Sequence, residues 1–268
     1  MHNAAFAAMG LDFCYVAFEV APENLAAALQ GARALGIVGL NATIPHKEAL
    51  LRLVEEISEE ARLIGAVNTL HWREGRLWGD NTDGRGFVAS LRASGMEVEG
   101  CRAVLLGAGG SARAVSVALA RSGVAELVMA NRTPERGKEL AAWLNRQVRA
   151  GIARAVELSS TALWRACEAA DLIVNTTAAG MFPQVEAMPV TDLPVLSPRT
   201  LVYDIIYNPR QTRFLQLAAA RGARTLNGVE MLVHQGALAF QQWTGQAPPL
   251  EVMREALIQA LQRPSSGG

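Results

Sequence analysis

A short glycine-rich stretch in the middle of the chain constrains the fold more than any other feature. Residues 104–106 form an apolar run, closely spaced glycines follow it, and helix-forming residues follow the glycines. In a G-x-G-x-x-A pattern the first glycine permits a tight turn after a buried strand, and the second lets the backbone approach a pyrophosphate. The first N–H groups of the next helix then suit an anion. A glycine-rich turn without a ligand is the alternative, but we predict a dinucleotide site at Gly107, Ala108, Gly109, Gly110, Ser111 and Ala112.

The residues after the next apolar run indicate which dinucleotide would bind. An acidic residue there would accept a hydrogen bond from a ribose 2′-hydroxyl and favour NAD. Residues 126–130 are instead followed by Asn131, Arg132 and Thr133, with Arg136 nearby. Arg132 could pair bidentately with a 2′-phosphate, which a carboxylate would repel. We therefore predict NADP(H) as cofactor; the alternative is that both arginines are solvated charges at the start of a helix.

Predicted strands and helices alternate along the second half of the chain. This alternation is typical of a doubly wound parallel sheet, so we expect an NADP-binding Rossmann-like domain over residues 83–227. Its expected helices are 112–121, 135–148, 163–169 and 211–221, and its expected strands are 126–130, 153–157, 171–175, 200–204 and 224–226.

The rest of the chain predicts a second, smaller α/β domain from residues 1–82 plus 228–268. We expect its sheet to be mainly parallel, with a hairpin appended around Glu74 and Gly75. Its other expected elements are helices at 4–9, 23–35, 48–57, 231–243 and 251–261 and strands at 13–20 and 37–40. The overall fold class is therefore α/β with two domains.

Composition narrows the partners and the cellular setting. The 268 residues are 50% hydrophobic and carry zero formal net charge, so no broad field attracts nucleic acid or a membrane surface, and we expect a small-molecule substrate. Three widely spaced cysteines fit reduced thiols in the cytoplasm. No apolar run is long enough for a membrane span, and the four histidines lack metal-ligand spacing, so no metal is expected.

Polar clusters outside the glycine turn are candidates for the chemistry. Lys47 follows the predicted strand 37–40, at the strand end where open α/β sheets place a ligand crevice, and its amine can carry a proton. Gln235 lies in an otherwise apolar helix and needs polar partners. Taken singly, each cluster has a structural alternative, such as a solvated Lys47 or an Asp83 that caps a helix. The clusters are 41–47, 65–69, 80–87 and 227–237.

Taken together, these motifs resemble the shikimate dehydrogenase family. The resemblance covers nearly the whole chain in order, which is far more specific than the glycine turn alone. It implies a cytoplasmic oxidoreductase that reversibly reduces 3-dehydroshikimate to shikimate with NADPH, a step of chorismate and aromatic amino acid biosynthesis. The motifs that carry it are Asn41–Lys47, Gly65–Thr69, Asn81–Gly84, Gly107–Ala112, Asn131–Thr133, Gly228–Gly236 and Phe240–Gly245.

The resemblance also implies roles for individual residues. Lys47 and Asp83 match the family's catalytic pair: Lys47 would donate a proton to the carbonyl oxygen in reduction and accept one in oxidation, while Asp83 would hold Lys47 and a substrate hydroxyl. The positions that match substrate-binding residues are Thr43, Asn68, Tyr207 and Gln235. The positions that match the nicotinamide side are Thr176, Ile205 and Gly228.

One departure from the family pattern affects the expected activity. The family normally opens with a strand and a Gly-x-Pro-x-x-His-Ser-x-Ser-Pro segment whose serines bind the shikimate carboxylate, and this sequence begins after that segment. We expect a start that was assigned too late or truncated. One alternative is a quinate/shikimate dehydrogenase using NAD or NADP, although Asn131, Arg132 and Thr133 argue against a preference for NAD. The other is a cofactor-binding paralogue impaired in substrate binding, which Lys47 and Asp83 argue against. We expect a monomer or a homodimer.

Overall fold

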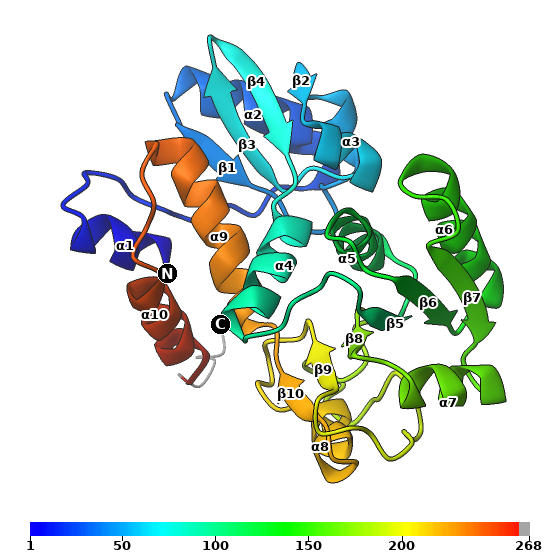
Figure 1. The fold of residues 1–268 in the computed structure, drawn as a ribbon. Helices are drawn as coiled ribbons and strands as arrows, with labels where there is room; N and C mark the ends of the chain where they lie inside the picture. The colour runs from blue at the N-terminus through cyan, green and yellow to red at the C-terminus, as the bar shows by residue number, and fades with distance from the viewer. Residues whose placement is uncertain (263–268) are drawn as a thin grey trace. The chain divides into compact units, whose positions relative to one another are not determined.

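The structure, a computed structural model, describes residues 1–262 and divides into two compact units (Figure 1). The first unit contains residues 1–83 and the described residues from 233 onward, and the second contains residues 84–232. The chain enters the second unit within helix α4 (Asp83–Ala93) and leaves it within helix α9 (Val229–Thr244). The boundaries predicted from the sequence, 82/83 and 227/228, fall at the starts of these two helices.

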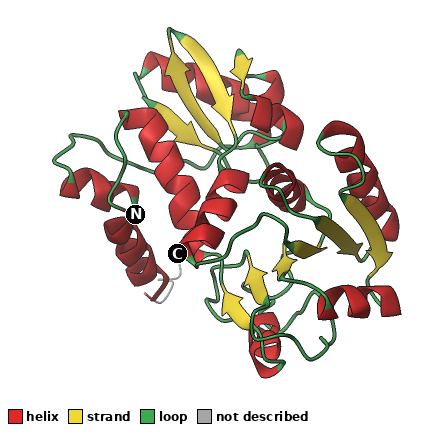
Figure 2. Ribbon diagram, in the orientation of Figure 1, coloured by secondary structure: helices red, strands yellow, loops and turns green. Residues whose placement is uncertain are grey.

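The second unit is built on a six-stranded sheet, coloured yellow with its red helices in Figure 2. The strand order is β10-β9-β8-β5-β6-β7, and every pairing is parallel. The elements are β5 (Arg102–Leu106), α5 (Gly110–Arg121), β6 (Glu126–Asn131), α6 (Pro134–Gln147), β7 (Ala153–Glu157), α7 (Thr161–Glu168), β8 (Leu172–Asn175), β9 (Leu201–Asp204), α8 (Arg213–Ala220) and β10 (Arg224–Leu226).

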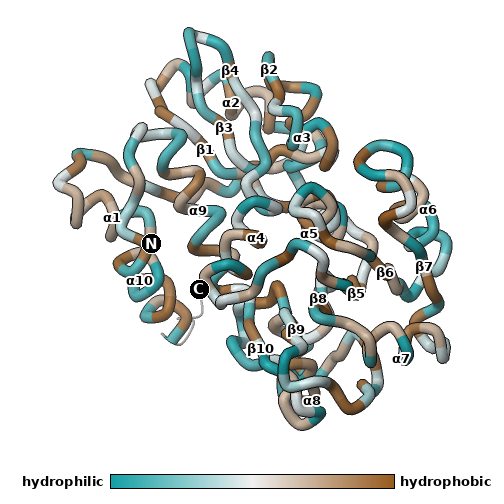
Figure 3. Tube along the Cα trace, viewed as in Figure 1, coloured by the Kyte–Doolittle hydropathy of each residue, from teal (hydrophilic) through white to brown (hydrophobic). Residues whose placement is uncertain are grey.

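Helices pack against the sheet because its strands carry apolar side chains on both faces. Val104 and Val202 share one buried cluster with residues of α7 and α8, such as Ala166 and Phe214. Hydrophobic and hydrophilic residues both occur along α6, as Figure 3 shows, and the buried residues of this helix include Leu144. The α/β class and the doubly wound parallel sheet predicted from the sequence are confirmed.

The strand order of this sheet reverses between β5 and β8. In open α/β sheets the carboxyl ends of the strands at such a reversal form the ligand crevice. Gly107 follows β5 and Thr176 follows β8, and a Cβ placed on Gly107 would lie 2.5 Å from the Thr176 Oγ1. The glycine turn therefore lies at the reversal point of the sheet.

The first unit has a smaller sheet of order β1-β3-β4-β2. Trp243 on α9 packs against the β1 and β3 strands: its Nε1 donates to the Leu70 carbonyl oxygen at 3.0 Å, and a Cβ on Gly39 would collide with its ring. Its elements, besides α9, are α1 (His2–Ala8), the 3₁₀ helix η1 (Pro22–Asn24), α2 (Leu25–Ala34), β1 (Gly39–Asn41), the 3₁₀ helix η2 (Ala49–Arg52), β2 (Glu56–Ile57), α3 (Glu59–Ile64), β3 (Thr69–Arg73), β4 (Arg76–Asp80) and α10 (Leu250–Gln262).

The expectation of a mainly parallel sheet in this smaller unit is wrong. The β1–β3 and β3–β4 pairings are antiparallel, and only β2–β4 is parallel. The predicted hairpin is correct, with Glu74 at φ 53° and Gly75 at φ 77° in its turn. Because β1 pairs directly with a hairpin strand, the hairpin forms the centre of the sheet and is not appended to a parallel core.

Two elements expected in this unit also differ. Residues 13–20 were expected as a strand, but the Asn3 side chain satisfies both backbone groups of Tyr15, at 2.6 and 2.9 Å, in place of a strand ladder. Residues 48–57 were expected as one helix, but η2 ends at Arg52 and the chain then forms the short strand β2. This strand pairs with β4, so β4 has a neighbour on each side. The short helix α3 was missed.

Candidate active site

A lysine–carboxylate pair forms the centre of the candidate site in the first unit. The Lys47 Nζ donates to the Asp83 Oδ2 at 2.7 Å. Both side chains are partly exposed, Lys47 by 28% and Asp83 by 17%, so each can still reach a ligand. An ammonium group has three donors, and this contact uses one of them. The pair can therefore donate a proton to, or accept one from, an oxygen placed beside it.

Asn68 fixes the orientation of the Asp83 carboxylate. Its Nδ2 donates to the Asp83 Oδ1 at 2.8 Å and to the Thr82 Oγ1 at 3.2 Å. Its Oδ1 accepts from the Thr82 N–H and from the Thr69 hydroxyl, both at 2.9 Å. Since Asn68 is buried and both ends of its amide are used, it can hold Asp83 in only one orientation.

Backbone hydrogen bonds bring these distant sequence motifs together. The Val67 N–H donates to the Lys47 carbonyl oxygen at 2.8 Å, and the Ala42 N–H donates to the Asn68 carbonyl oxygen at 2.8 Å. The Asn68 N–H donates to the Asp80 carbonyl oxygen at 3.0 Å. The turn with Lys47, the loop before β3 and the end of β4 are thus joined at one end of the strands of the small sheet.

The other predicted substrate-binding residues have different surroundings. The Gln235 Oε1 accepts from the buried Thr82 hydroxyl at 3.4 Å, so α9 joins the same group. Thr43 is exposed in the turn that leads to Lys47. Tyr207 belongs to the second unit, where it is 42% exposed.

Two positioning residues, Asn81 and Thr82, lie in the predicted polar cluster 80–87, but neither was assigned a role from the sequence. The Asn81 Oδ1 accepts from the Asp83 N–H at 3.0 Å and its Nδ2 donates to the Ala66 carbonyl oxygen at 3.0 Å, while Thr82 links Asn68 to Gln235. Both are almost fully buried. Their signal in the sequence is a run of polar residues directly before a helix, but only tertiary packing distinguishes such buried positioning groups from ordinary caps.

The glycine turn of the second unit leaves open space where a phosphate would bind. Gly107 has a φ of 118°, which L side chains rarely adopt. Nothing lies within 4 Å of a Cβ placed on Gly109 or Gly110, and α5 begins at Gly110 without a side-chain cap. Ala112 is fully buried, so only a small residue fits there. Ala108 and Ser111 lie in the same turn. These residues fit the predicted diphosphate, because backbone donors face unobstructed space.

The predicted ribose end carries two cationic side chains that have no partner among the described residues. Asn131 ends β6, and its Nδ2 donates to the carbonyl oxygen of Thr133, the N-cap of α6, at 2.9 Å. Arg132 and Arg136 are exposed, and within residues 1–262 neither guanidinium has a hydrogen-bond or ion-pair partner. Both remain available for a phosphate.

The three residues predicted for the nicotinamide side are packed within the second unit. The Thr176 hydroxyl donates to the Leu106 carbonyl oxygen at 2.8 Å, next to the glycine turn. The Gly228 N–H donates to the Ile206 carbonyl oxygen at 2.9 Å. A Cβ on Gly228 would lie 2.0 Å from the Ile205 carbonyl oxygen, so this close approach requires glycine.

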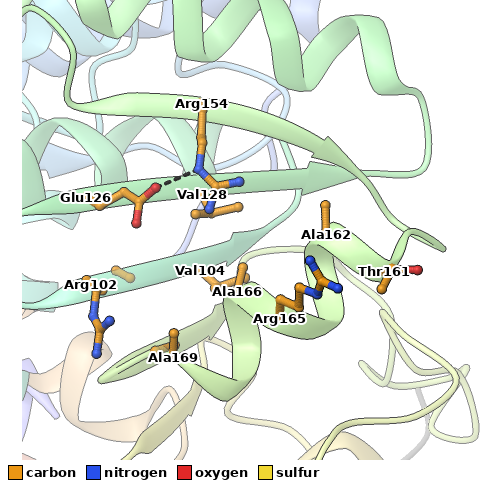
Figure 4. Close-up of a pocket in the computed structure, with 12 residues that line it drawn as sticks. Arg102, Val104, Glu126, Val128, Arg154, Thr161, Ala162, Arg165, Ala166 and Ala169 are labelled. Atoms are coloured by element: carbon orange, nitrogen blue, oxygen red, sulfur yellow. Dashed lines mark hydrogen bonds and ion pairs between the residues drawn. The ribbon is translucent and has the colours of Figure 1, made fainter.

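A surface cavity of about 330 Å³ lies elsewhere in the second unit, between α7 and the sheet (Figure 4). None of the site residues predicted from the sequence lines this cavity. Of its arginines, Arg154 pairs with Glu126 at 2.6 Å and Arg102 lies 3.9 Å from Asp171. Because two of its three arginines are paired with acidic neighbours and the rest of the lining is mostly alanine and valine, we assign no function to the cavity.

A doubly wound unit with a glycine turn, combined with an α/β unit that carries a lysine–carboxylate pair, is the architecture of a dinucleotide-dependent dehydrogenase. Family models place the chain more narrowly. "Shikimate dehydrogenase substrate binding domain" matches residues 1–70, "Shikimate / quinate 5-dehydrogenase" matches 89–215, and "Shikimate 5'-dehydrogenase C-terminal domain" matches 228–258.

Individual relatives agree with these models. The chain is 48% identical to a shikimate dehydrogenase (NADP(+)) of Methanopyrus kandleri over 97% of this chain and 90% of that protein. The solved structure of Thermus thermophilus shikimate 5-dehydrogenase with NADP(H) and shikimate matches at 39% identity and a TM-score of 0.85, covering 97% of this chain and 92% of that one. Quinate dehydrogenase from Corynebacterium glutamicum in complex with NAD matches at 33% identity and a TM-score of 0.86, covering 96% and 92%. The chain belongs to the shikimate dehydrogenase family, which confirms the resemblance found in its sequence.

Proposed function

We propose that the chain catalyses the reversible NADPH-dependent reduction of 3-dehydroshikimate to shikimate, a step towards chorismate and the aromatic amino acids. The observation that carries this proposal is the hydrogen-bonded group of Lys47, Asp83 and Asn68 in a member of this family. A ketone reduction needs a proton donor at the carbonyl oxygen, and this group supplies one in a fixed orientation.

Lys47 and Asp83 carry out the proton chemistry. In reduction the Lys47 ammonium donates its proton to the substrate carbonyl oxygen, which becomes the hydroxyl of the product. In oxidation the neutral amine accepts that proton. Asp83 holds Lys47 through the 2.7 Å contact and accepts a hydrogen bond from a substrate hydroxyl with its remaining lone pairs. When bound, NADPH supplies the hydride that reduces the carbonyl carbon.

Neutral hydrogen-bonding groups suit the ring of a polyhydroxylated substrate. Gln235 contacts ring hydroxyls from the first unit, and Asn68 does so by exchanging its 3.2 Å bond to Thr82 for one to the substrate. Thr43 offers an exposed hydroxyl in the turn before Lys47. Tyr207 contributes a phenol from the second unit. A site built to bind hydroxyl groups rejects analogues that lack them, because its own polar groups would be left unpaired.

The cofactor is held by the second unit. The N–H groups of residues 108–112 bind the diphosphate in the turn that Gly107 makes, and Arg132 and Arg136 bind the 2′-phosphate, with Asn131 and Thr133 supporting that loop. Thr176, Ile205 and Gly228 face the nicotinamide. No carboxylate occupies the end of β6, so NADP is preferred over NAD.

The chain works in the cytoplasm as a monomer or a homodimer, without a metal. Its three cysteines are free thiols, as a reducing compartment allows. None of the helices in residues 1–262 is both long and apolar enough to cross a membrane.

The direct test follows NADP⁺ reduction by absorbance with shikimate as substrate. Quinate and NAD⁺ serve as comparison substrate and cofactor, because one family member matched here is a quinate dehydrogenase with NAD. We expect the highest kcat/KM with shikimate and NADP⁺. A higher value with quinate and NAD⁺ would assign the chain to the quinate branch. Binding of NADPH without any turnover would identify a cofactor-binding paralogue.

A further inference from the structure

A buried polar network joins the carboxyl ends of β8 and β9 to helix α8. Asn175 ends β8, Asp204 ends β9, and Thr212 is the N-cap of α8; all three are fully buried. The Thr212 hydroxyl donates to the Asp204 Oδ2 at 2.7 Å, and the Asn175 Nδ2 donates to the Asp204 Oδ1 at 3.1 Å. Asp204 therefore links two strands and a helix of the second unit.

The partners of Asp204 are all neutral. Besides the two side chains, its Oδ1 accepts from the Ile206 N–H at 3.1 Å, and among the described residues no cation pairs with it. Burial raises the pKa of Asp204 to about 6, although the three hydrogen bonds act in the opposite direction. Burying an acid without a cation is costly, so this group is better explained by the geometry it imposes than by stability.

Asp204 holds the backbone at two of the three residues assigned to the nicotinamide, Ile205 and Gly228. Ile205 directly follows Asp204, and its N–H donates to the Asn175 carbonyl oxygen at 3.2 Å. The Ile206 N–H binds the Asp204 carboxylate, and the Ile206 carbonyl oxygen accepts from the Gly228 N–H at 2.9 Å. The Asp204 carboxylate thus holds the Ile206 N–H, and through Ile206 it positions its neighbour Ile205 and, by way of the Ile206 carbonyl oxygen, Gly228.

Asn175 holds the backbone at the third of these residues, Thr176. Its Oδ1 accepts from the Thr177 N–H at 3.0 Å and from the Thr177 hydroxyl at 2.7 Å, and the Thr177 Oγ1 accepts from the Ala179 N–H at 3.1 Å. These bonds form a tight turn that contains Thr176. The N–H and the hydroxyl of Thr176 in turn donate to the Leu106 carbonyl oxygen, at 2.9 and 2.8 Å.

We propose that Asn175, Asp204 and Thr212 are positioning residues that hold Thr176, Ile205 and Gly228 in the backbone arrangement that orients the nicotinamide ring. This proposal rests on the cofactor role given to those three residues under the proposed function. Displacement of a reacting group by about 1 Å can lower a rate about 100-fold, so weakening the network should lower kcat more than it lowers cofactor affinity.

The test compares Thr212→Val with Thr212→Ser. Valine keeps the shape of threonine but removes the hydroxyl, which binds Asp204 and also caps α8 by accepting from the Leu215 N–H at 3.3 Å, whereas serine keeps the hydroxyl. For Thr212→Val we expect kcat to fall about 10- to 100-fold and the Kd for NADPH to rise less than about fivefold. Thr212→Ser should restore kcat to within about twofold of the original. Asn175→Ala should act in the same direction as Thr212→Val.

Thr200→Val is the matched control. Thr200 is also buried and precedes the same strand, β9, at its opposite end, where its hydroxyl donates to the Ala170 carbonyl oxygen at 2.9 Å. This variant loses one buried hydrogen bond from the same sheet, far along the strand from the network. We expect its melting temperature to fall less than that of Thr212→Val, which also loses the N-cap of α8, and we expect its kcat to stay unchanged.

A second measurement separates this proposal from the proposed function. The fluorescence of bound NADPH reports the surroundings of the nicotinamide, and we expect it to change in Thr212→Val but not in Thr200→Val. If the unmodified protein binds NADPH but does not oxidise shikimate, the proposed function is wrong. The fluorescence comparison between Thr212→Val and Thr200→Val would still test the positioning role. Equal kcat and equal fluorescence in both valine variants would overturn the proposal, and so would a failure of the unmodified protein to bind NADPH.

Discussion

The two units present their candidate functional groups in opposite ways. In the first unit, the Asp83 side chain contacts both Lys47 and Asn68; the amide of Asn68 is fully occupied, while Lys47 and Asp83 keep hydrogen-bonding positions for a ligand. In the second unit, residues 109–110 leave open space beside the backbone, and two exposed guanidinium groups have no side-chain partner within residues 1–262. One surface is organised before a ligand arrives, and the other is left unobstructed.

The chemistry assigned to each surface explains this difference. Proton transfer needs a donor at a fixed distance and angle, so the side chains that hold the donor must be rigid in advance. A diphosphate and a 2′-phosphate are bound by backbone N–H groups and by long cationic side chains, which need only free space and the correct sign of charge. Substitutions in the candidate site of the first unit should therefore lower kcat, whereas substitutions on the phosphate-binding surface of the second unit should weaken cofactor binding.

The largest effect is expected from Lys47→Ala. Removing the proton donor should lower kcat by about 100- to 10,000-fold, because that is the usual contribution of a general acid or base. The Kd for NADPH should not change, since Lys47 belongs to the first unit. Steady-state oxidation of shikimate, with cofactor binding measured in parallel, gives both values.

The chain supplies a matched control for that variant, since Lys138 is its only other lysine. It lies exposed on α6, so Lys138→Ala removes the same charge and the same side chain from a position outside the candidate site. We expect its kcat to equal that of the unmodified protein. Full turnover by Lys47→Ala would refute the assignment of Lys47 as the catalytic group.

The glycine turn and the doubly wound sheet could be predicted from the sequence because both are local signals. Residues 107–112 combine a turn residue, open backbone and a helix start within a few positions, and β7 was predicted with the bounds that the structure shows, Ala153–Glu157. The small sheet was harder to predict. Its topology depends on which strand pairs with the hairpin, and local periodicity contains no information about partners.

The helix α3 illustrates a signal that was present and missed. Ser58 caps its first turn by accepting from the Ala61 N–H at 3.0 Å, and Gly65 ends it with a φ of 75°. A capping serine followed by acidic residues and a glycine marks a helix even when it is this short. The buried roles of Asn81 and Thr82, by contrast, follow only from tertiary packing.

Asp83 in the first unit and Asp204 in the second provide the next test of the comparison. Asp83 has a lysine partner, whereas Asp204 has only neutral donors, and burial raises the pKa of Asp204 to about 6. A raised pKa means that the folded state binds the proton more tightly than the unfolded state does. The stability contributed by protonated Asp204 is therefore complete below about pH 4 and is lost as the pH rises through about 6.

Asp204→Asn should remove this dependence. The amide keeps an acceptor for the Asn175 and Ile206 donors and does not titrate. We expect the free energy of unfolding of the variant, relative to the original, to increase by up to about 3 kcal/mol between about pH 4 and pH 7. Urea denaturation at several pH values measures it, and two parallel stability curves would contradict the expectation.

Arg132→Ala tests the charge that the second unit leaves unpaired. The loss of charge-assisted hydrogen bonds to a 2′-phosphate, about 1.5 to 3 kcal/mol each, should raise the KM for NADP⁺ about 10- to 100-fold. The KM for NAD⁺ should stay the same, because NAD⁺ carries no 2′-phosphate. If both KM values rise equally, Arg132 supports the loop and does not read the cofactor.

The smallest effect is expected from a methyl group added to the open backbone. Gly109 has a φ of −91° and free space around its Cβ position, so Gly109→Ala should leave the melting temperature unchanged and weaken NADPH binding about tenfold, or about 1.4 kcal/mol, by occupying the space meant for the diphosphate. Gly107→Ala is the contrasting variant, because its φ of 118° and the Thr176 hydroxyl leave no room for a methyl group, so it should lower the melting temperature as well. Titration of NADPH with thermal unfolding separates the two. An unchanged NADPH affinity in Gly109→Ala would mean that this backbone does not contact the diphosphate, and the open surface of the second unit would then need another ligand.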